Sequence, residues 1–211
     1  MWVRKQGILF LIALGSMCGI DYRWALFCNQ CMPKILAVGC APLEVFAPLL
    51  ICAILGCIFF NSLFVKRLHP YCLHLFSLFS TLFFALFLLG LLKMGLGRAR
   101  PYLFFSQGIQ GFFGGSIARD YLSCPSSHAA MAYIFAYFIG GWYPTKRLFF
   151  YCLAILFSLS RTITCEHFIS DVLLGGQIGH LLSFGMERGI HPFLHRYITA
   201  YLTQNRAQKN G

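Results

Sequence analysis

Three short polar segments interrupt an otherwise apolar sequence, and each holds side chains suited to binding or transferring phosphate. They are Lys93-x6-Arg100-Pro101, Pro125-Ser126-Ser127-His128 and Ser160-Arg161-x5-His167-x3-Asp171. Lysine and arginine supply positive charge and several N–H donors, which together can hold a phosphate dianion. The three segments therefore indicate a site for a phosphorylated molecule.

The second segment has the residues of a helix start. Proline is favoured at the first position of a helix, and serine is a favoured cap. Free N–H groups and the positive end of the helix dipole meet there, which makes the position an anion site. We therefore expect Ser126 and Ser127 to contribute to phosphate binding, although either serine alone would also serve as an ordinary cap.

The histidines of these segments add acid–base chemistry. His167 and Asp171 are four residues apart, so they share one face of a helix that begins by His167. A carboxylate beside an imidazole fixes its tautomer and raises its basicity, as in hydrolytic triads. His128 is a second imidazole that can deliver a proton near neutral pH. The sequence thus offers an imidazole–carboxylate pair and a separate proton donor.

The composition shows what kind of chain carries this site. Of its 211 residues, 58% are hydrophobic and only 11% are charged. A soluble domain carries about 25% charged residues, and a disordered chain is polar and poor in aromatics, so both classes are excluded and an integral membrane protein is expected. The net charge of +11 would suggest nucleic acid on a soluble protein, but here lysines and arginines flank the spans. No nucleic acid partner is expected.

Six apolar segments are candidates for membrane-spanning helices, each of which needs about 20 residues. They are Gly7–Ile20, Val45–Val65, Leu75–Leu92, Ser127–Trp142, Leu148–Ser160 and Asp171–Met186. We expect residues 1–211 to form one all-α, six-helix membrane domain, with the polar segments within 93–171 and a polar cytoplasmic tail over 187–211. The glycine-rich stretch 94–124 is expected to be a long functional loop.

The first span is expected to be an uncleaved helix that extends beyond Asp21, since no small-residue cleavage site of a signal peptide precedes that residue. Six spans place both termini on one side of the membrane. Once the motif residues Lys93, Arg100 and Arg161 are set aside, most other basic residues lie on the side of the termini. The positive-inside rule then predicts cytoplasmic termini and places all three polar segments on the outer face.

These segments resemble the signature of the type 2 phosphatidic acid phosphatase superfamily, which also contains the vanadium haloperoxidases. That signature reads K-x6-RP, PSGH and SR-x5-H-x3-D, and the chain matches it at ten positions, Lys93, Arg100, Pro101, Pro125, Ser126, His128, Ser160, Arg161, His167 and Asp171. Ser127 stands where the family usually has glycine. Its backbone N–H remains available, while its hydroxyl narrows the pocket or adds a donor.

The resemblance implies a mechanism. His167 attacks phosphorus, oriented by Asp171, and a phosphohistidine forms, while His128 protonates the leaving oxygen. The phosphate oxygens are held by Lys93, Arg100, Arg161 and the amides near Ser126 and Ser127. No cofactor or metal is expected, since the sequence has no carboxylate cluster to hold a metal. Arg98 has two alternatives, a further phosphate ligand or a charge in a solvated loop.

The resemblance also implies a function, a lipid phosphatase in the bacterial inner membrane that acts on a phosphomonoester or pyrophosphate at the outer face. Phosphatidate, phosphatidylglycerophosphate, undecaprenyl diphosphate and a lipid A phosphate group all fit as substrates. A phosphotransferase that uses an acceptor alcohol in place of water is the alternative enzyme. An alternative of another class is a non-catalytic membrane protein or transporter, which the presence of His128, His167 and Asp171 disfavours.

The remaining cysteines and histidines have ordinary explanations. A disulfide between Cys124 and Cys165 could brace the polar loops in an oxidising compartment. Another could form among Cys28, Cys31 and Cys40, although packing or loop cysteines are the simpler interpretation. Three further histidines are expected to be interfacial residues without a role in the site, His180, His191 and His195.

Overall fold

The computed structural model describes residues 2–17, 19–31, 56, 70–190 and 192. The predicted span Val45–Val65 lies outside these residues apart from Gly56, as do Cys40, His191, His195 and most of the predicted tail. The described part is all helical, with one isolated bridge between Arg98 and Phe112 and no strand. The predicted all-α class is confirmed.

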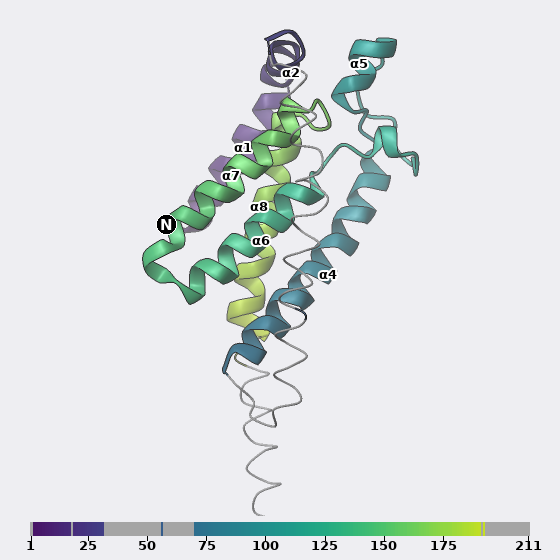
Figure 1. Cartoon of the computed structure of the whole chain (residues 1–211). Coiled ribbons are helices and arrows are strands. Elements are labelled where there is room, and N and C mark those ends of the chain that lie inside the picture. The colour runs from purple at the N-terminus through teal and green to yellow at the C-terminus, as the bar shows by residue number, and fades with distance from the viewer. Residues whose placement is uncertain (1, 18, 32–55, 57–69, 191, 193–211) are drawn as a thin grey trace, which may run out of the picture.

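Seven α-helices account for most of the described residues (Figure 1). They are α1 Trp2–Met17, α2 Ile20–Cys31, α4 Pro70–Leu96, α5 Pro101–Gln107, α6 Ser127–Trp142, α7 Arg147–Ile163 and α8 Ile169–Gly185. A π-helix, η3 (Met186–Ile190), continues α8, and single 3₁₀ turns occupy Arg119–Tyr121 and Pro144–Lys146. Helix α6 begins and ends at the predicted residues, and α4 and α7 extend the predicted spans by a few residues at each end. Helix α8 begins two residues before its predicted span and ends one residue short of it.

The predicted count of six spans is not confirmed. Within the described ranges, only the His74–Leu96 part of α4 is long and apolar enough to cross a bilayer alone, and α1 with α2 could make one more, bent span. Helices α6, α7 and α8 have 16, 17 and 17 residues, so each is about 25 Å long against about 30 Å of hydrocarbon. Helix α4 is apolar on both faces, since Leu78 is buried whereas Phe83 is 77% exposed, as expected for a helix that meets lipid.

The first predicted span is interrupted rather than continuous. Helix α1 ends at Met17, α2 begins at Ile20, and their axes differ by 68°. The prediction that one helix extends beyond Asp21 is therefore wrong. The physical reason is that Asp21 is fully buried and paired with Arg98, so the chain turns where this carboxylate meets its partner.

Helices α6 and α8 cross in close contact because glycines face the contact. A Cβ atom added at Gly175 would lie 2.1 Å from the carbonyl oxygen of Ser126, and one at Gly179 would lie 2.4 Å from that of Ala130. Glycines four residues apart allow backbones to approach in this way. The contact joins the second and third polar segments, since the Ser126 N–H donates to the carbonyl oxygen of Asp171 at 2.9 Å.

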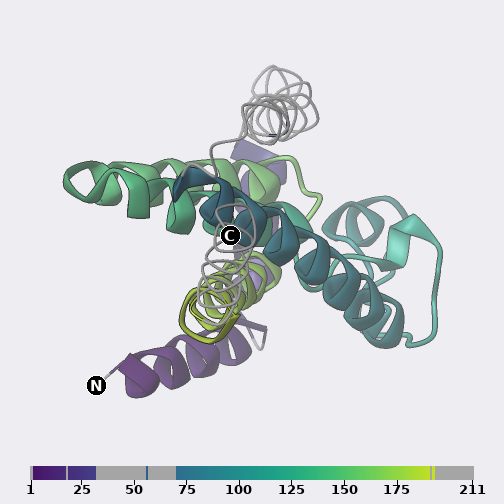
Figure 2. The ribbon, with the colours of Figure 1, turned by 90° about the horizontal axis from the view of Figure 1, so that it is seen from below.

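The glycine-rich stretch after α4 is folded back on itself rather than extended. Gly97 has φ of +58°, and a Cβ atom there would lie 2.6 Å from the backbone nitrogen of Gly114. The Ser123 N–H donates to the Arg98 carbonyl at 3.1 Å, and the Arg100 N–H donates to that of Asp120 at 2.9 Å. Figure 1 shows this segment, with α5, beyond the C-terminal end of α4, and Figure 2 shows it to one side of that helix. The fold thereby holds the two arginines of the first polar segment in place.

Candidate active site

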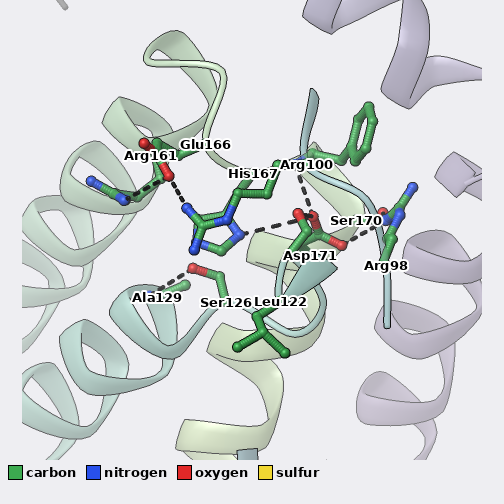
Figure 3. A network of polar contacts seen from close by, with 12 residues as sticks. Arg98, Arg100, Leu122, Ser126, Ala129, Arg161, Glu166, His167, Ser170 and Asp171 are labelled. Atoms are coloured by element: carbon green, nitrogen blue, oxygen red, sulfur yellow. Dashed lines mark hydrogen bonds and ion pairs between the residues drawn. The ribbon is translucent and has the colours of Figure 1, made fainter. Parts of the chain in front are cut away.

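His167 and Asp171 lie together where α8 begins (Figure 3). Asp171 is in the first turn, but His167 precedes the Phe168 cap, so the expected helix start by His167 is two residues too early. His167 is 2% exposed and Asp171 is fully buried. The imidazole Nδ1 lies 3.9 Å from the Asp171 Oδ2, and this nitrogen has no hydrogen-bond partner among the described residues. The pair is therefore in electrostatic contact without a hydrogen bond, since 3.9 Å exceeds hydrogen-bond distance.

The Asp171 carboxylate is held by three donors. Its Oδ2 accepts from the Ser123 hydroxyl at 2.6 Å and from the backbone N–H of Phe168 at 2.9 Å, and its Oδ1 accepts from Arg98 at 2.6 Å. Three donors from separate segments fix the orientation of the Asp171 carboxylate beside His167.

Positive side chains from three elements surround His167. They are Lys93 at the end of α4, Arg100 in the loop before α5, and Arg161 in the last turn of α7. Burial, and then the charges of these three groups, lower the pKa of His167 well below its ordinary value. Since a depressed pKa favours the unprotonated ring, His167 is neutral at neutral pH, with a lone pair free to react. His128, in the first turn of α6, also lies within electrostatic range of His167.

The serines of the second segment lie at the start of α6. Ser126 is the cap, and its hydroxyl accepts from the Ala129 N–H at 3.4 Å. The Ser126 N–H already donates to Asp171. The N–H groups at a helix start have no partner within the helix, so those that an anion could reach here begin at Ser127. Of the two serine amides predicted to bind phosphate, the Ser126 N–H is therefore already used, and the Ser127 N–H is the one that remains for this role.

Glu166 is a member of the site that sequence reasoning missed. Its carboxylate pairs with Arg100, lies 3.9 Å from Arg161 and lies 3.6 Å from the exposed Arg119. Figure 3 shows Glu166 between the two buried arginines. The Glu166 carboxylate therefore pairs with Arg100 and Arg161, which are two of the three basic side chains predicted to hold phosphate. Its position next to His167, as one of only six acidic residues in the chain, was the signal available in the sequence.

Arg98 is neither the solvated charge nor the phosphate ligand that the sequence left open. It is 2% exposed, and its guanidinium lies 2.9 Å from Asp21 and 2.6 Å from Asp171. It also lies over the Phe168 ring at 4.3 Å from the centroid. Although burial opposes it, the charges of the two aspartates raise the pKa of Arg98 above its ordinary value. Asp21 was missed as a site residue, and a lone acid in an apolar N-terminal segment was its signal.

The disulfide that the sequence left open between Cys124 and Cys165 is not formed, because both are free thiols. Cys124 faces Asp171, whereas the Cys165 sulfur is directed toward the carbonyl oxygen of Ile163. Cys28 and Cys31 are also free. Within residues 2–31 and 70–192 where these are described, no three His, Cys, Asp or Glu side chains are grouped to hold a metal ion.

His180 is more deeply placed than the interfacial residue that was predicted. It is half-buried, and its Nδ1 lies 2.9 Å from the Tyr151 hydroxyl. Its ring also packs edge-on against Tyr137. These contacts lie well along α8 from His167, so His180 belongs to the packing of the bundle.

Comparison with known proteins gives consistent matches. A sequence model of the PAP2 superfamily matches residues 74–192, a range that holds all three polar segments. The lipid A 1-phosphatase of Rhizobium etli is 35% identical over 104 residues, which cover 48% of this chain and 44% of that protein. The lipid A 1-phosphatase of Rhizobium johnstonii is 33% identical over 102 residues, covering 48% and 42%. The matches thus span less than half the length of these relatives.

A solved structure is similar in fold. The transmembrane PAP2-type phosphatidylglycerolphosphate phosphatase from Bacillus subtilis superposes with a TM-score of 0.59, covering 87% of this chain and 92% of that one, at 22% identity. The similarity extends over most of the chain, and at this identity it concerns the fold alone.

Proposed function

This chain belongs to the PAP2 superfamily, and we propose that it is a membrane lipid phosphatase in which His167 is the nucleophile. One observation carries the proposal. A buried imidazole with a lowered pKa lies between the fixed carboxylate of Asp171 and the cations Arg100 and Arg161. A neutral imidazole is nucleophilic, and arginines are suited to the oxygens of a phosphoryl group.

In the proposed reaction the Nε2 of His167 attacks phosphorus in line with the bond to the lipid oxygen. The N–P bond forms as the P–O bond breaks, and the departing oxygen takes a proton from His128, whose protonated form is favoured once the negatively charged phosphate group is bound. Asp171 stabilises the positive charge that develops on the imidazole. Water then attacks the phosphohistidine, neutral His128 takes its proton, and inorganic phosphate leaves.

During both steps the phosphoryl oxygens carry the charge that must be stabilised. Arg100, Arg161 and Lys93 are the groups proposed to bind them, together with the helix start at Ser127. Lys93 donates to the Leu122 carbonyl at 2.8 Å, which holds its ammonium toward the loop between α5 and α6. Because the three cations come from α4, the following loop and α7, the folded bundle is needed to assemble them.

The substrate proposed for first testing is the 1-phosphate of lipid A, because two relatives at about 35% identity bear that activity in their names. The site is proposed to face the outside of the inner membrane with cytoplasmic termini, which the distribution of basic residues supports. Release of inorganic phosphate from lipid A, phosphatidylglycerophosphate, phosphatidate and undecaprenyl diphosphate, by purified protein in detergent with a chelator present, tests the proposal.

Release from at least one of these lipids is expected, with lipid A preferred. Mass analysis of the same reactions distinguishes release of phosphate from its transfer to a second lipid. Failure to release phosphate from any of them, or loss of release on chelation, would contradict the proposed function.

Replacing Glu166 with glutamine is expected to strengthen phosphate binding. The carboxylate pairs with Arg100 and Arg161, so it competes with an incoming phosphate for the same donors. Without its charge, the KM for the lipid and the inhibition constant of inorganic phosphate should both fall about 3- to 30-fold, which corresponds to about 0.7–2 kcal/mol. Steady-state kinetics with added phosphate measures both.

A matched control is Glu187→Gln, which removes one negative charge at the other end of α8. Glu187 accepts from the Tyr137 hydroxyl in the turn of η3, about 24 Å from Asp171 at about 1.5 Å per residue. Its kinetic constants should stay within twofold of the unaltered protein. An unchanged or weaker inhibition by phosphate in Glu166→Gln would show that Glu166 does not compete for the arginines.

A further inference from the structure

Asp21 is a buried acid that joins the N-terminal helices to the proposed active site. Its carboxylate is fully buried. Its Oδ2 lies 2.9 Å from the Arg98 guanidinium, and the other nitrogen of that guanidinium lies 2.6 Å from Asp171. We propose that Asp21 is a positioning residue that acts through Arg98 on Asp171 and so on His167. The inference rests on the proposed function, because it assigns Asp171 and His167 the roles given there.

Asp21 also fixes the start of α8, the helix that carries Asp171. Its Oδ1 accepts from the Ser170 N–H at 2.9 Å, across 149 positions of sequence, and its Oδ2 accepts from the Ser170 hydroxyl. The first N–H groups of a helix have no partner within it, and Ser170 is the second residue of α8. A side chain from a distant helix thus caps the turn that presents Asp171.

The charge balance of the network gives Asp21 a second effect. Two carboxylates share one guanidinium in a buried site, so the group of Asp21, Arg98 and Asp171 keeps one net negative charge. If Asp21 were neutral, Arg98 would pair with Asp171 alone, and the field that Asp171 exerts on His167 would be largely cancelled. Interactions of this kind are strong where water is excluded.

Helix α2 is docked so that Asp21 cannot easily move away. The Trp24 indole N–H donates to the Thr162 hydroxyl at 2.9 Å, and the Tyr22 ring packs edge-on against Phe168 at 5.2 Å between centroids. Both partners, Thr162 and Phe168, lie within the polar segment that holds His167. Residue 21 lies outside the range 74–192 that the superfamily model matches, so this contact extends the proposed site into the N-terminal part of the chain.

The test is Asp21→Asn in the full chain, assayed for phosphate release from the best lipid substrate. The amide keeps the size of the side chain and loses its charge. We expect kcat to fall about 10- to 100-fold, the range known for groups that orient metal-ligating side chains in the same indirect way. The KM and the inhibition constant of inorganic phosphate should stay within twofold, because Arg100 and Arg161 do not contact Asp21. Glu187→Gln, the same chemical change far from the site, is the control.

Arg98→Gln and the double variant complete the test by showing whether Asp21 acts through Arg98. In the Arg98→Gln background, Asp21→Asn should cost less than threefold in kcat, since the link is already broken. Should Asp21→Asn fail to fold, Ser170→Ala removes one donor to Asp21 and is expected to lower kcat alone, by a smaller factor.

The outcomes separate the two proposals. An unaltered protein that releases no phosphate contradicts the proposed function itself. An active protein whose Asp21→Asn or Ser170→Ala variant behaves like the control overturns the role of Asp21. Equal losses in kcat and in phosphate binding, or full additivity with Arg98→Gln, would mean that Asp21 only stabilises the fold and would also overturn it.

Discussion

Replacing His167 with alanine is expected to abolish phosphate release, with a loss in kcat of at least about 10³-fold. The physical reason is that the variant lacks the atom proposed to form the bond to phosphorus, so no phosphohistidine can form. The arginines, Asp171 and the start of α6 would remain, and binding of inorganic phosphate should therefore persist. Turnover of the lipid and inhibition by phosphate, measured on the same preparation, distinguish these effects.

Chemical trapping makes this prediction more specific than a loss of activity. The unaltered protein, mixed with substrate labelled in the phosphate and quenched in alkali, should retain label on histidine, and His167→Ala should retain none. His180→Ala is the matched control, since it alters a histidine on the same helix that contacts Tyr151 instead of the site. It should stay active and take up label. Activity within tenfold of normal in His167→Ala would rule out the proposed nucleophile.

Replacing Asp171 with asparagine is expected to lower kcat about 10²- to 10⁴-fold, the range typical of a carboxylate that orients a catalytic imidazole. Asparagine has the same shape but no charge, so it cannot stabilise the positive imidazole. Its amide group would also face donors, because both oxygens of Asp171 accept hydrogen bonds, one from Arg98 and the other from Ser123 and Phe168.

The KM of Asp171→Asn should change little, since the groups proposed to bind phosphate are Arg100, Arg161 and Lys93. Ser123→Ala serves as a graded comparison, because it removes one of the hydrogen bonds to Asp171 and leaves the charge. Its loss in kcat should be smaller than that of Asp171→Asn. A kcat for Asp171→Asn within tenfold of normal would show that the carboxylate does not support His167. The loss in kcat for Asp171→Asn should also exceed that for Asp21→Asn, because Asp21 acts on His167 only through Arg98 and Asp171.

Local patterns in the sequence determined the parts of this protein that depend on neighbours in the chain. The apolar segments predicted helices α4, α6, α7 and α8, and the proline and serines of the second segment predicted the start of α6 at Ser127. The four-residue spacing predicted that His167 and Asp171 lie close together, and they do, although α8 begins at Ile169 and His167 stands just before the helix. The order of the motif residues identified the superfamily, which the comparisons confirm. In each case the information is local, since helix periodicity and capping act over one or two turns.

Contacts between distant segments decided the rest. Asp21 and Ser170 are 149 positions apart, and no spacing rule relates them, so only the folded chain shows that the first acid caps the last helix of the site. The same holds for Glu166 among the arginines and for the approach of Gly175 to Ser126. Burying an unpaired charge costs much free energy, so a buried charge is expected to have a partner. The sequence does not show which residue that partner is. In the folded protein Arg98 pairs with two aspartates, Asp21 and Asp171, and these contacts connect the N-terminal helices to the residues proposed to do the chemistry.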